Sequence, residues 1–207
     1  MPTSSDSYAA LYLREVGEIV RSVEPAALDE LANALAEVRG REGRLFILGV
    51  GGGAAHASHA VNDFRKLCDF EAYTPTDNVA EVTARTNDEG WETSFDAWLR
   101  TSRISSRDAI LVFSVGGGSR AHNVSVNLVR AIGLAQEVGA AVFAVVGRAD
   151  GAAAEAADLC IVIAAPPERR TPHVEEFQAI VWHLLVSHPA LVKAPGKWES
   201  VESAHDR

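Results

Sequence analysis

Residues 44–53 read RLFILGVGGG, an apolar run from Arg44 to Val50 that stops at three glycines, Gly51, Gly52 and Gly53. Polar and apolar residues do not alternate in this run, which is typical of a strand buried on both faces of a parallel sheet. A helical pattern over residues 55–67 follows the glycines. Strand, glycine turn and helix in succession indicate an α/β unit.

The same unit recurs toward both ends of the chain. Continuous apolar runs occupy residues 109–115, 141–146 and 159–163, and a weaker one occupies residues 70–74. Helical patterns follow at residues 124–138, 152–157 and 174–187, and Pro189 marks the end of the last one. Alternation of this kind, with right-handed crossovers, predicts a doubly wound α/β fold with a five-stranded parallel sheet.

Two amphipathic helices precede the first strand. Apolar residues recur at helical spacing over residues 8–39, and Pro25 opens the second helix in a position that suits proline. Their apolar stripes pack either against another subunit or, equally, against their own domain. We expect one domain over residues 1–207, with N-terminal helices to residue 40, an α/β core over 44–189 and a polar, frayed tail over 193–207.

Composition narrows the class of protein. The chain has 207 residues, of which 47% are hydrophobic and 23% charged, and a net charge of -9. A negative balance argues against non-specific nucleic-acid binding. The N-terminus lacks the features of a signal peptide, and no apolar run reaches the roughly 20 residues of a membrane span. Cys68 and Cys160 form no CxxC pair, so we expect a cytoplasmic protein without disulfides.

Two glycine-rich turns mark the expected ligand site. The first is Gly49–Gly53, and the second is Ser114–Ser119, reading SVGGGS. Both follow a strand and precede a helix, where backbone N–H groups form an anion site at the carboxyl edge of the sheet. For a dinucleotide site, Asp69 and Glu71 lie at about the required spacing, but they start a weak strand rather than end one, which makes this the less favoured interpretation. No P-loop occurs. Tight turns without a ligand are the remaining alternative.

Ionisable residues lie on two of the predicted helices. His56, His59 and Asp63 follow the first turn, and His59 and Asp63 share a face because they are four residues apart. Glu175 and His183 lie in the mostly apolar last helix, eight residues apart. A buried carboxylate and imidazole there would need partners. An exposed polar stripe is the simpler interpretation of the same pattern.

Taken in order, these motifs resemble the phosphoheptose isomerases of the sugar isomerase (SIS) fold. The first turn resembles their GNGGS, His59–Asp63 their HxxxE, and the second turn their ISTSGNS phosphate loop. Residues 87–90, Asn-Asp-Glu-Gly, resemble their NDxG, and Glu175 with His183 resembles their Gln and His eight residues apart. The resemblance covers residues 8–189.

The resemblance implies a homotetramer with an active site shared between subunits, often holding zinc. It implies isomerisation of sedoheptulose 7-phosphate to D-glycero-D-manno-heptose 7-phosphate through an enediol(ate). Asp63 and His183 would be the catalytic acid–base pair, and the metal ligands would be His59, Asp63, Glu175 and His183. The following residues would bind substrate or its phosphate: Gly51, Gly52, Gly53, Asn87, Asp88, Ser114, Gly116, Gly118 and Ser119.

This chain departs from the family pattern at several of these positions. Asp63 replaces the catalytic Glu, Glu175 replaces the Gln, and Val115 and Gly116 replace hydroxyl residues of the phosphate loop. An isomerase of a longer ketose phosphate would fit such changes. So would a non-catalytic relative that binds a sugar phosphate or assembles with replication proteins. The retained ionisable residues favour the enzyme.

Overall fold

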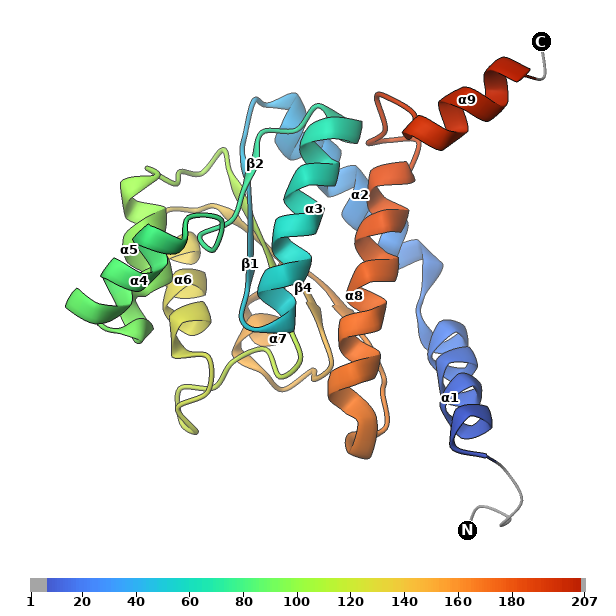
Figure 1. Ribbon diagram of the computed structural model, residues 1–207. Coiled ribbons are helices and arrows are strands. Elements are labelled where there is room, and N and C mark those ends of the chain that lie inside the picture. Colours follow the sequence, from blue (N-terminus) through green and yellow to red (C-terminus); the bar gives the residue numbers. More distant parts are fainter. Residues whose placement is uncertain (1–6, 206–207) are drawn as a thin grey trace.

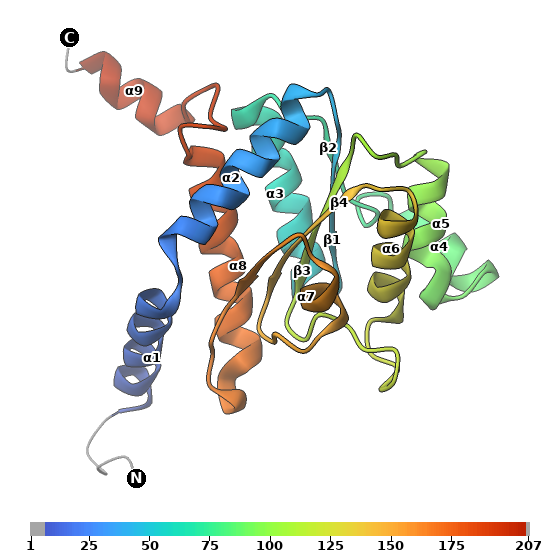
Figure 2. The same cartoon turned by 180° about the vertical axis from the view of Figure 1, so that it is seen from behind.

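The computed structural model describes residues 7–205 and has three layers, with helices on both faces of a parallel sheet (Figures 1 and 2). The sheet has the order β2-β1-β3-β4-β5, and every neighbouring pair is parallel, which confirms the predicted doubly wound fold. The strands are β1 (Leu45–Gly49), β2 (Ala72–Tyr73), β3 (Ala109–Ser114), β4 (Ala141–Val146) and β5 (Leu159–Val162).

Helices surround the sheet. The α-helices are α1 (Tyr8–Ser22), α2 (Pro25–Gly40), α3 (Gly52–Cys68), α4 (Val79–Asp88), α5 (Ser94–Thr101), α6 (Val126–Glu137), α7 (Ala152–Ala156), α8 (Arg170–Ser187) and α9 (Lys197–His205). Two short 3₁₀ helices, η1 (Trp91–Thr93) and η2 (Pro167–Arg169), precede α5 and α8. No helix among the described residues is both long and apolar enough to traverse a lipid bilayer.

Two apolar cores hold the layers together. Alternate residues of a strand point to opposite faces, so Leu45 and Ile47 of β1 enter one core with α2, α3 and α8. Phe46 and Leu48 enter the other core with α5, α6 and α7. Burial on both faces explains why the central strands are apolar throughout.

The structure differs from the expected elements in several places. Helices α4 and α5 lie in a region where no helix was expected, and the polar tail contains α9 rather than frayed chain. Helix α8 begins at Arg170 instead of residue 174, because Pro172 falls in its first turn, where a missing N–H costs nothing. Strand β2 has only two residues and pairs at the edge of the sheet.

The two N-terminal helices behave differently. Helix α2 buries Leu28, Leu31 and Leu35 against its own domain. Helix α1 extends away from the sheet beside the start of α8 (Figure 1) and leaves Tyr8, Leu13 and Val20 exposed. The alternative of packing against its own domain therefore holds for α2, whereas α1 keeps an exposed apolar face.

Candidate active site and metal centre

The turn after β1 is held tightly against the neighbouring strand. Gly51 has φ 62°, a backbone conformation that favours glycine. A Cβ on Gly53 would lie 2.6 Å from the carbonyl oxygen of Phe113 in β3, so a larger residue would push the two strand ends apart. This turn fixes the start of α3 at the carboxyl edge of the sheet.

The turn after β3 presents backbone donors at the same edge. The Ser114 hydroxyl oxygen accepts a hydrogen bond from the Gly117 N–H over 3.0 Å, and Ser119 pairs with Val124 to close the following loop. Within residues 7–205, the N–H groups of Gly116 and Gly118 donate to no protein acceptor. Unpaired donors of this kind suit an anion.

A cavity of about 180 Å³ separates the two turns. Gly53, Ser114 and Gly116 line one side of it, and Glu175 and Gln178 of α8 line the other. The carboxylate of Glu175 packs against Gly52 so closely that a Cβ on Gly52 would lie 2.5 Å from the carboxyl carbon. The cavity therefore has hydrogen-bonding groups on both sides and one negative charge.

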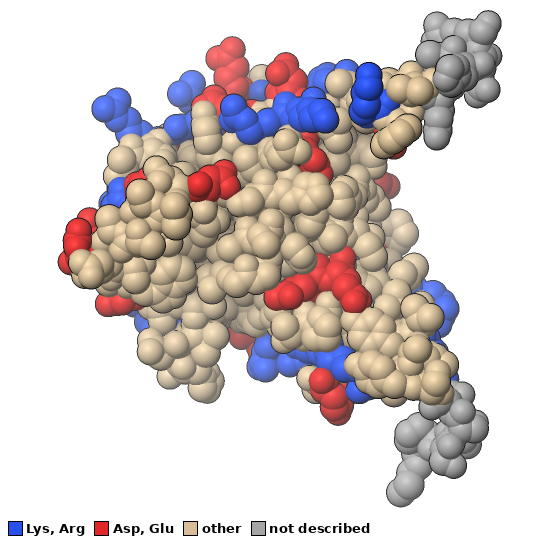
Figure 3. Space-filling view, viewed as in Figure 1, with Lys and Arg blue, Asp and Glu red and all other residues tan. Residues whose placement is uncertain are grey.

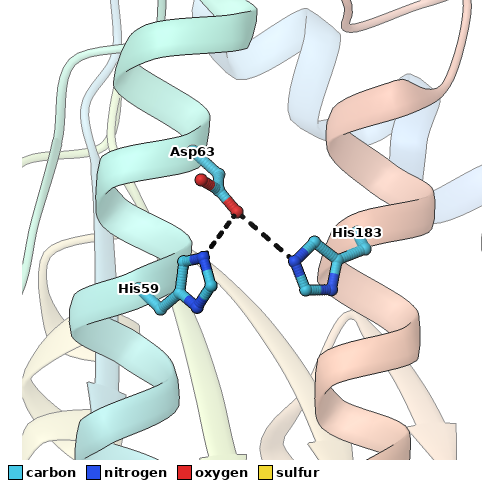
Figure 4. Close-up of side chains that lie close together, drawn as sticks. All are labelled: His59, Asp63 and His183. Atoms are coloured by element: carbon cyan, nitrogen blue, oxygen red, sulfur yellow. Dashed lines mark ion pairs between the residues drawn. The ribbon is translucent and has the colours of Figure 1, made fainter. Parts of the chain in front are cut away.

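Helices α3 and α8 bring together His59, Asp63 and His183 (Figure 4). The Nε2 atoms of His59 and His183 lie 3.4 and 3.6 Å from the same oxygen, Oδ2 of Asp63. The ligand atoms of all three residues lie within 4.8 Å of one another. Both imidazoles are more than half exposed, whereas the carboxylate is largely buried. The cluster thus opens to the outer face of the helix pair.

Neighbouring groups hold this cluster in position. Nδ1 of His183 lies 2.8 Å from the carbonyl oxygen of Ala179. Because a carbonyl oxygen only accepts, Nδ1 carries the proton and donates this hydrogen bond. Nε2 is therefore free as a ligand atom. The indole N–H of Trp182 donates to Oδ2 of Asp63, and the amide of Asn62 donates to Oδ1. The carboxylate therefore has a fixed orientation before any ligand binds.

Glu175 does not lie with the other three expected metal ligands. Eight residues of helix separate it from His183, which corresponds to about 12 Å along the axis. Its position beside Gly52 is at the opposite end of the seam between α3 and α8. Between the two ends, His56 Nδ1 donates to Gln178 Oε1 over 3.1 Å. One chain thus brings together three of the four.

Asn87 and Asp88 lie apart from both turns. They are exposed at the end of α4, where the Asn87 amide donates to the Asp88 carboxylate over 2.7 Å. Figures 1 and 2 place α4 away from α3 and α8. The structure does not bring these two residues into the site of a single chain.

Helix α1 fixes the beginning of α8 through a buried polar network. Arg169 donates to both carboxylate oxygens of Glu15, over 2.7 and 2.5 Å, and Nε2 of the buried His173 lies 3.0 Å from Glu15 Oε2. The hydrogen bonds from Arg169 lower the pKa of Glu15 to about 2. Nearby, the hydrogen bond from Tyr12 to Glu176 raises the pKa of the Tyr12 phenol to about 12.

Comparison with known proteins identifies the family. Residues 11–147 match the family described as the SIS domain. The chain belongs to the SIS domain family. A phosphoheptose isomerase from Rhodospirillum rubrum is 28% identical over 170 residues, covering 76% of this chain and 85% of that protein.

Two further proteins are similar to this chain. The lincomycin biosynthesis protein LmbN of Streptomyces lincolnensis is 34% identical over 188 residues, covering 85% of this chain and 66% of that protein. The structure of a phosphoheptose isomerase from Neisseria gonorrhoeae superposes with a TM-score of 0.74 at 22% identity, over 86% of this chain and 92% of that one. At that identity the superposition supports the fold alone.

The sequence patterns did not indicate several residues of this SIS site. Trp182 counted as part of the apolar pattern of the last helix, although a buried indole there needs a partner. Gln178 stood out as polar in the same helix but was given no role, although its buried amide needs a partner too. Arg148 and His122, which line a second cavity beside the turn after β3, lie in loops without a recognisable motif. Only the position of Arg148 just after a strand could have drawn attention to it.

Proposed function

We propose that this protein is an aldose–ketose isomerase that converts sedoheptulose 7-phosphate to D-glycero-D-manno-heptose 7-phosphate. The observation that carries the proposal is the cluster of His59, Asp63 and His183. It lies on the two helices that also line the glycine-turn cavity, in a chain of the SIS family whose relatives include phosphoheptose isomerases.

The donor set of this cluster fits a zinc ion. Zinc accepts imidazole nitrogens and carboxylate oxygens as ligands. Around a tetrahedral zinc ion, neighbouring ligand atoms lie about 3.3–3.5 Å from each other. The separations of 3.4 and 3.6 Å from Asp63 to the two histidines agree with that spacing. When bound, zinc would act as a Lewis acid on the sugar carbonyl.

Asp63 and His183 are suited to move the protons of the reaction. Asp63 removes a proton from C1 of the ketose while the Nε2–H of His183, in a state where that nitrogen does not hold the metal, gives one to the oxygen on C2, which yields the enediol. Return of the proton to C2 and loss of the proton from the oxygen on C1 complete the aldose. No oxidant is needed, because the two carbons exchange oxidation states.

A homotetramer would allow Glu175 of one subunit to act as a metal ligand in the site of another subunit. In one chain Glu175 lies beside Gly52, so a fourth protein ligand at the His59 cluster has to come from a second copy or be replaced by substrate or water. The exposed side chains Tyr8, Leu13 and Val20 of α1 supply an apolar surface for such an assembly. Residues 87 and 88 would likewise reach a site only across a subunit boundary.

The direct test is to incubate the purified protein with sedoheptulose 7-phosphate and follow the reaction by NMR. New aldose signals at constant mass are expected, together with exchange of solvent deuterium into the sugar. Absence of both, with bound metal and correct fold verified, contradicts the proposal. Binding of the sugar phosphate without conversion would instead support a non-catalytic binding protein.

A longer ketose phosphate is the second candidate substrate. It is favoured by the departures from the family pattern at Asp63, Glu175, Val115 and Gly116. A ketose phosphate one carbon longer belongs in the same NMR assay, and the ratio of kcat/KM values for the two sugars decides between them.

A further inference from the structure

One side of α3 carries four residues of the contact with α8. Gly52, His56, His59 and Asp63 are four, three and four positions apart, so they lie on the same side of the helix. With a rise of about 1.5 Å per residue, His56 is about 6 Å along the axis from Gly52 and about 4.5 Å from His59. His56 therefore lies between the glycine turn at the start of α3 and the cluster that contains His59.

The hydrogen bonds of Gln178 determine which nitrogen of His56 carries the proton. Gln178 is fully buried, and its amide Nε2 donates to the carbonyl oxygen of Val145 over 3.5 Å. Because that carbonyl oxygen only accepts, the amide has a single orientation, in which Oε1 lies 3.1 Å from Nδ1 of His56. Oε1 also accepts, so Nδ1 of the neutral imidazole carries the proton and Nε2 keeps its lone pair.

Nε2 of His56 is accessible to a ligand. It has no hydrogen-bond partner among residues 7–205. The enclosed side-chain atoms that lack a partner in this part of the chain belong to Asn127 and Arg170, so the unpaired Nε2 of His56 is not enclosed. The imidazole packs on Trp182 with ring centroids 5.1 Å apart, which restricts the orientation of the ring. His56 thus presents one hydrogen-bond acceptor at a fixed place.

The contact between α3 and α8 contains no cation from either helix. Residues 52–64 of α3 and 171–187 of α8 include neither Lys nor Arg. Figure 3 shows the face formed by these helices with Lys and Arg side chains along its upper edge, acidic side chains gathered below its centre and a largely uncharged surface between them. A fixed acceptor without a nearby cation suits the hydroxyl groups of a sugar, because a phosphate oxygen and an unprotonated nitrogen would both accept.

We infer that Nε2 of His56 accepts a hydrogen bond from one hydroxyl group in the middle of the sugar chain of the substrate. This assignment rests on the proposed function, which puts the carbonyl end of the ketose at the cluster of His59 and its phosphate at the glycine turns. The carbons between these ends then pass His56. His56 is a specificity residue in this arrangement, because it favours a sugar that carries the hydroxyl group over an analogue that lacks it.

The experiment combines one change in the protein with one change in the substrate. Wild type and His56→Phe are assayed by NMR with sedoheptulose 7-phosphate and with its 3-deoxy, 4-deoxy, 5-deoxy and 6-deoxy analogues. Phenylalanine keeps a ring against Trp182 but offers no acceptor. His56→Ala is measured in the same way, so that the result does not depend on how well the larger ring is accommodated.

For one of the four analogues, wild type should lose about fivefold to tenfold in kcat/KM relative to the parent sugar, as expected for a hydrogen bond between neutral groups. Both His56 variants should lose a similar factor with the parent sugar and show no further loss with that analogue, because the contact is already absent. His188→Phe is the matched control, since His188 pairs with Asp29 away from α3, and it should discriminate among the sugars as wild type does.

Equal discrimination among the sugars by wild type and the His56 variants, or none by wild type, overturns the assignment and leaves the proposed reaction standing. Calorimetric titration of the same sugars covers a protein that binds them without turnover. The same pattern in the Kd values then supports the contact with His56 and contradicts the proposed reaction. Absence of binding for all five sugars overturns both, so the failure of one is distinguishable from the failure of the other.

Discussion

Trp182 donates its indole N–H to Oδ2 of Asp63 over 3.3 Å, joining the core of α8 to the carboxylate on α3. The indole is 1% exposed, and its ring centroid lies 5.4 Å from that of His59 and 4.8 Å from that of His183. One buried side chain therefore contacts all three members of the cluster. Trp182 is a positioning residue for the candidate metal centre.

Trp182→Phe should keep the ring packing and remove the hydrogen bond. We expect kcat to fall about tenfold with little change in KM, because the carboxylate is misplaced while the phosphate site is intact. Loss of a hydrogen bond to a charged group should also lower the free energy of unfolding by about 1.5–3 kcal/mol. Trp98→Phe, which changes an indole on α5 that contacts Phe46, is the control. A kcat of Trp182→Phe equal to that of wild type would show that this hydrogen bond does not position the Asp63 carboxylate for catalysis.

Substitution of Asp63 tests the proposed base. Asp63→Asn should abolish isomerisation, because an amide cannot accept the proton, while the chain still folds. Asp63→Glu should retain some activity, since it keeps the carboxylate. Deuterium exchange at C1, measured by NMR, reports the proton transfer directly, and exchange at the wild-type rate in Asp63→Asn would exclude Asp63 as the base.

Metal content tests the cluster independently of turnover. His59→Ala and His183→Ala should each lose bound zinc by elemental analysis, since a site with two remaining protein ligands holds the ion weakly. His188→Ala is the control, because that histidine pairs with Asp29 away from the cluster. Equal zinc in all four proteins, wild type included, would place the metal elsewhere.

Ser119→Ala tests the phosphate placement. If the hydroxyl contributes a hydrogen bond to a charged group, its loss should raise KM by about tenfold or more, corresponding to about 1.5–3 kcal/mol. The backbone donors of Gly116 and Gly118 remain, so binding should weaken rather than disappear. An unchanged KM would show that the hydroxyl does not face the phosphate.

The sequence predicted those parts of the fold that depend on local patterns. The apolar runs ending at Gly51 and Gly116 identify strands buried on both faces, and their parallel order follows from the helices between them. The four-residue spacing of His59 and Asp63 correctly places them on one helix face. Their meeting with His183 depends on the register between α3 and α8, which the family resemblance supplied and spacing alone does not.

The sequence could not place residues whose partners lie in other elements. The family resemblance implied that Glu175 is a metal ligand, but in one chain its carboxylate lies beside Gly52, two turns of helix from His183. Helix α4 has no buried residue, so its sequence has no apolar stripe that would predict a helix. Asn87, at the end of this helix, was expected in the site.

The last prediction concerns the ion pair that fixes the start of α8. Glu15 has a pKa of about 2 in the folded protein, lowered from 4.5 chiefly by hydrogen bonds from Arg169. A carboxyl with a lowered pKa stabilises the fold at pH values above 4.5, and this stabilisation is lost as the pH falls from 4.5 through 2. Glu15→Gln should therefore reduce the free energy of unfolding by about 1.5–3 kcal/mol at pH 7, because the hydrogen bonds to a charged group are weakened.

The pH dependence separates this charge effect from simple packing. Denaturant unfolding of wild type and Glu15→Gln is measured from pH 7 to pH 2.5, with Glu18→Gln, an exposed carboxylate on the same helix, as the control. The difference between wild type and Glu15→Gln should shrink steadily below pH 4.5, since protonation makes the native side chain neutral as well. Glu18→Gln should match wild type throughout. A difference for Glu15→Gln that stays constant over the whole range would mean that the carboxylate charge does not stabilise the contact between α1 and α8.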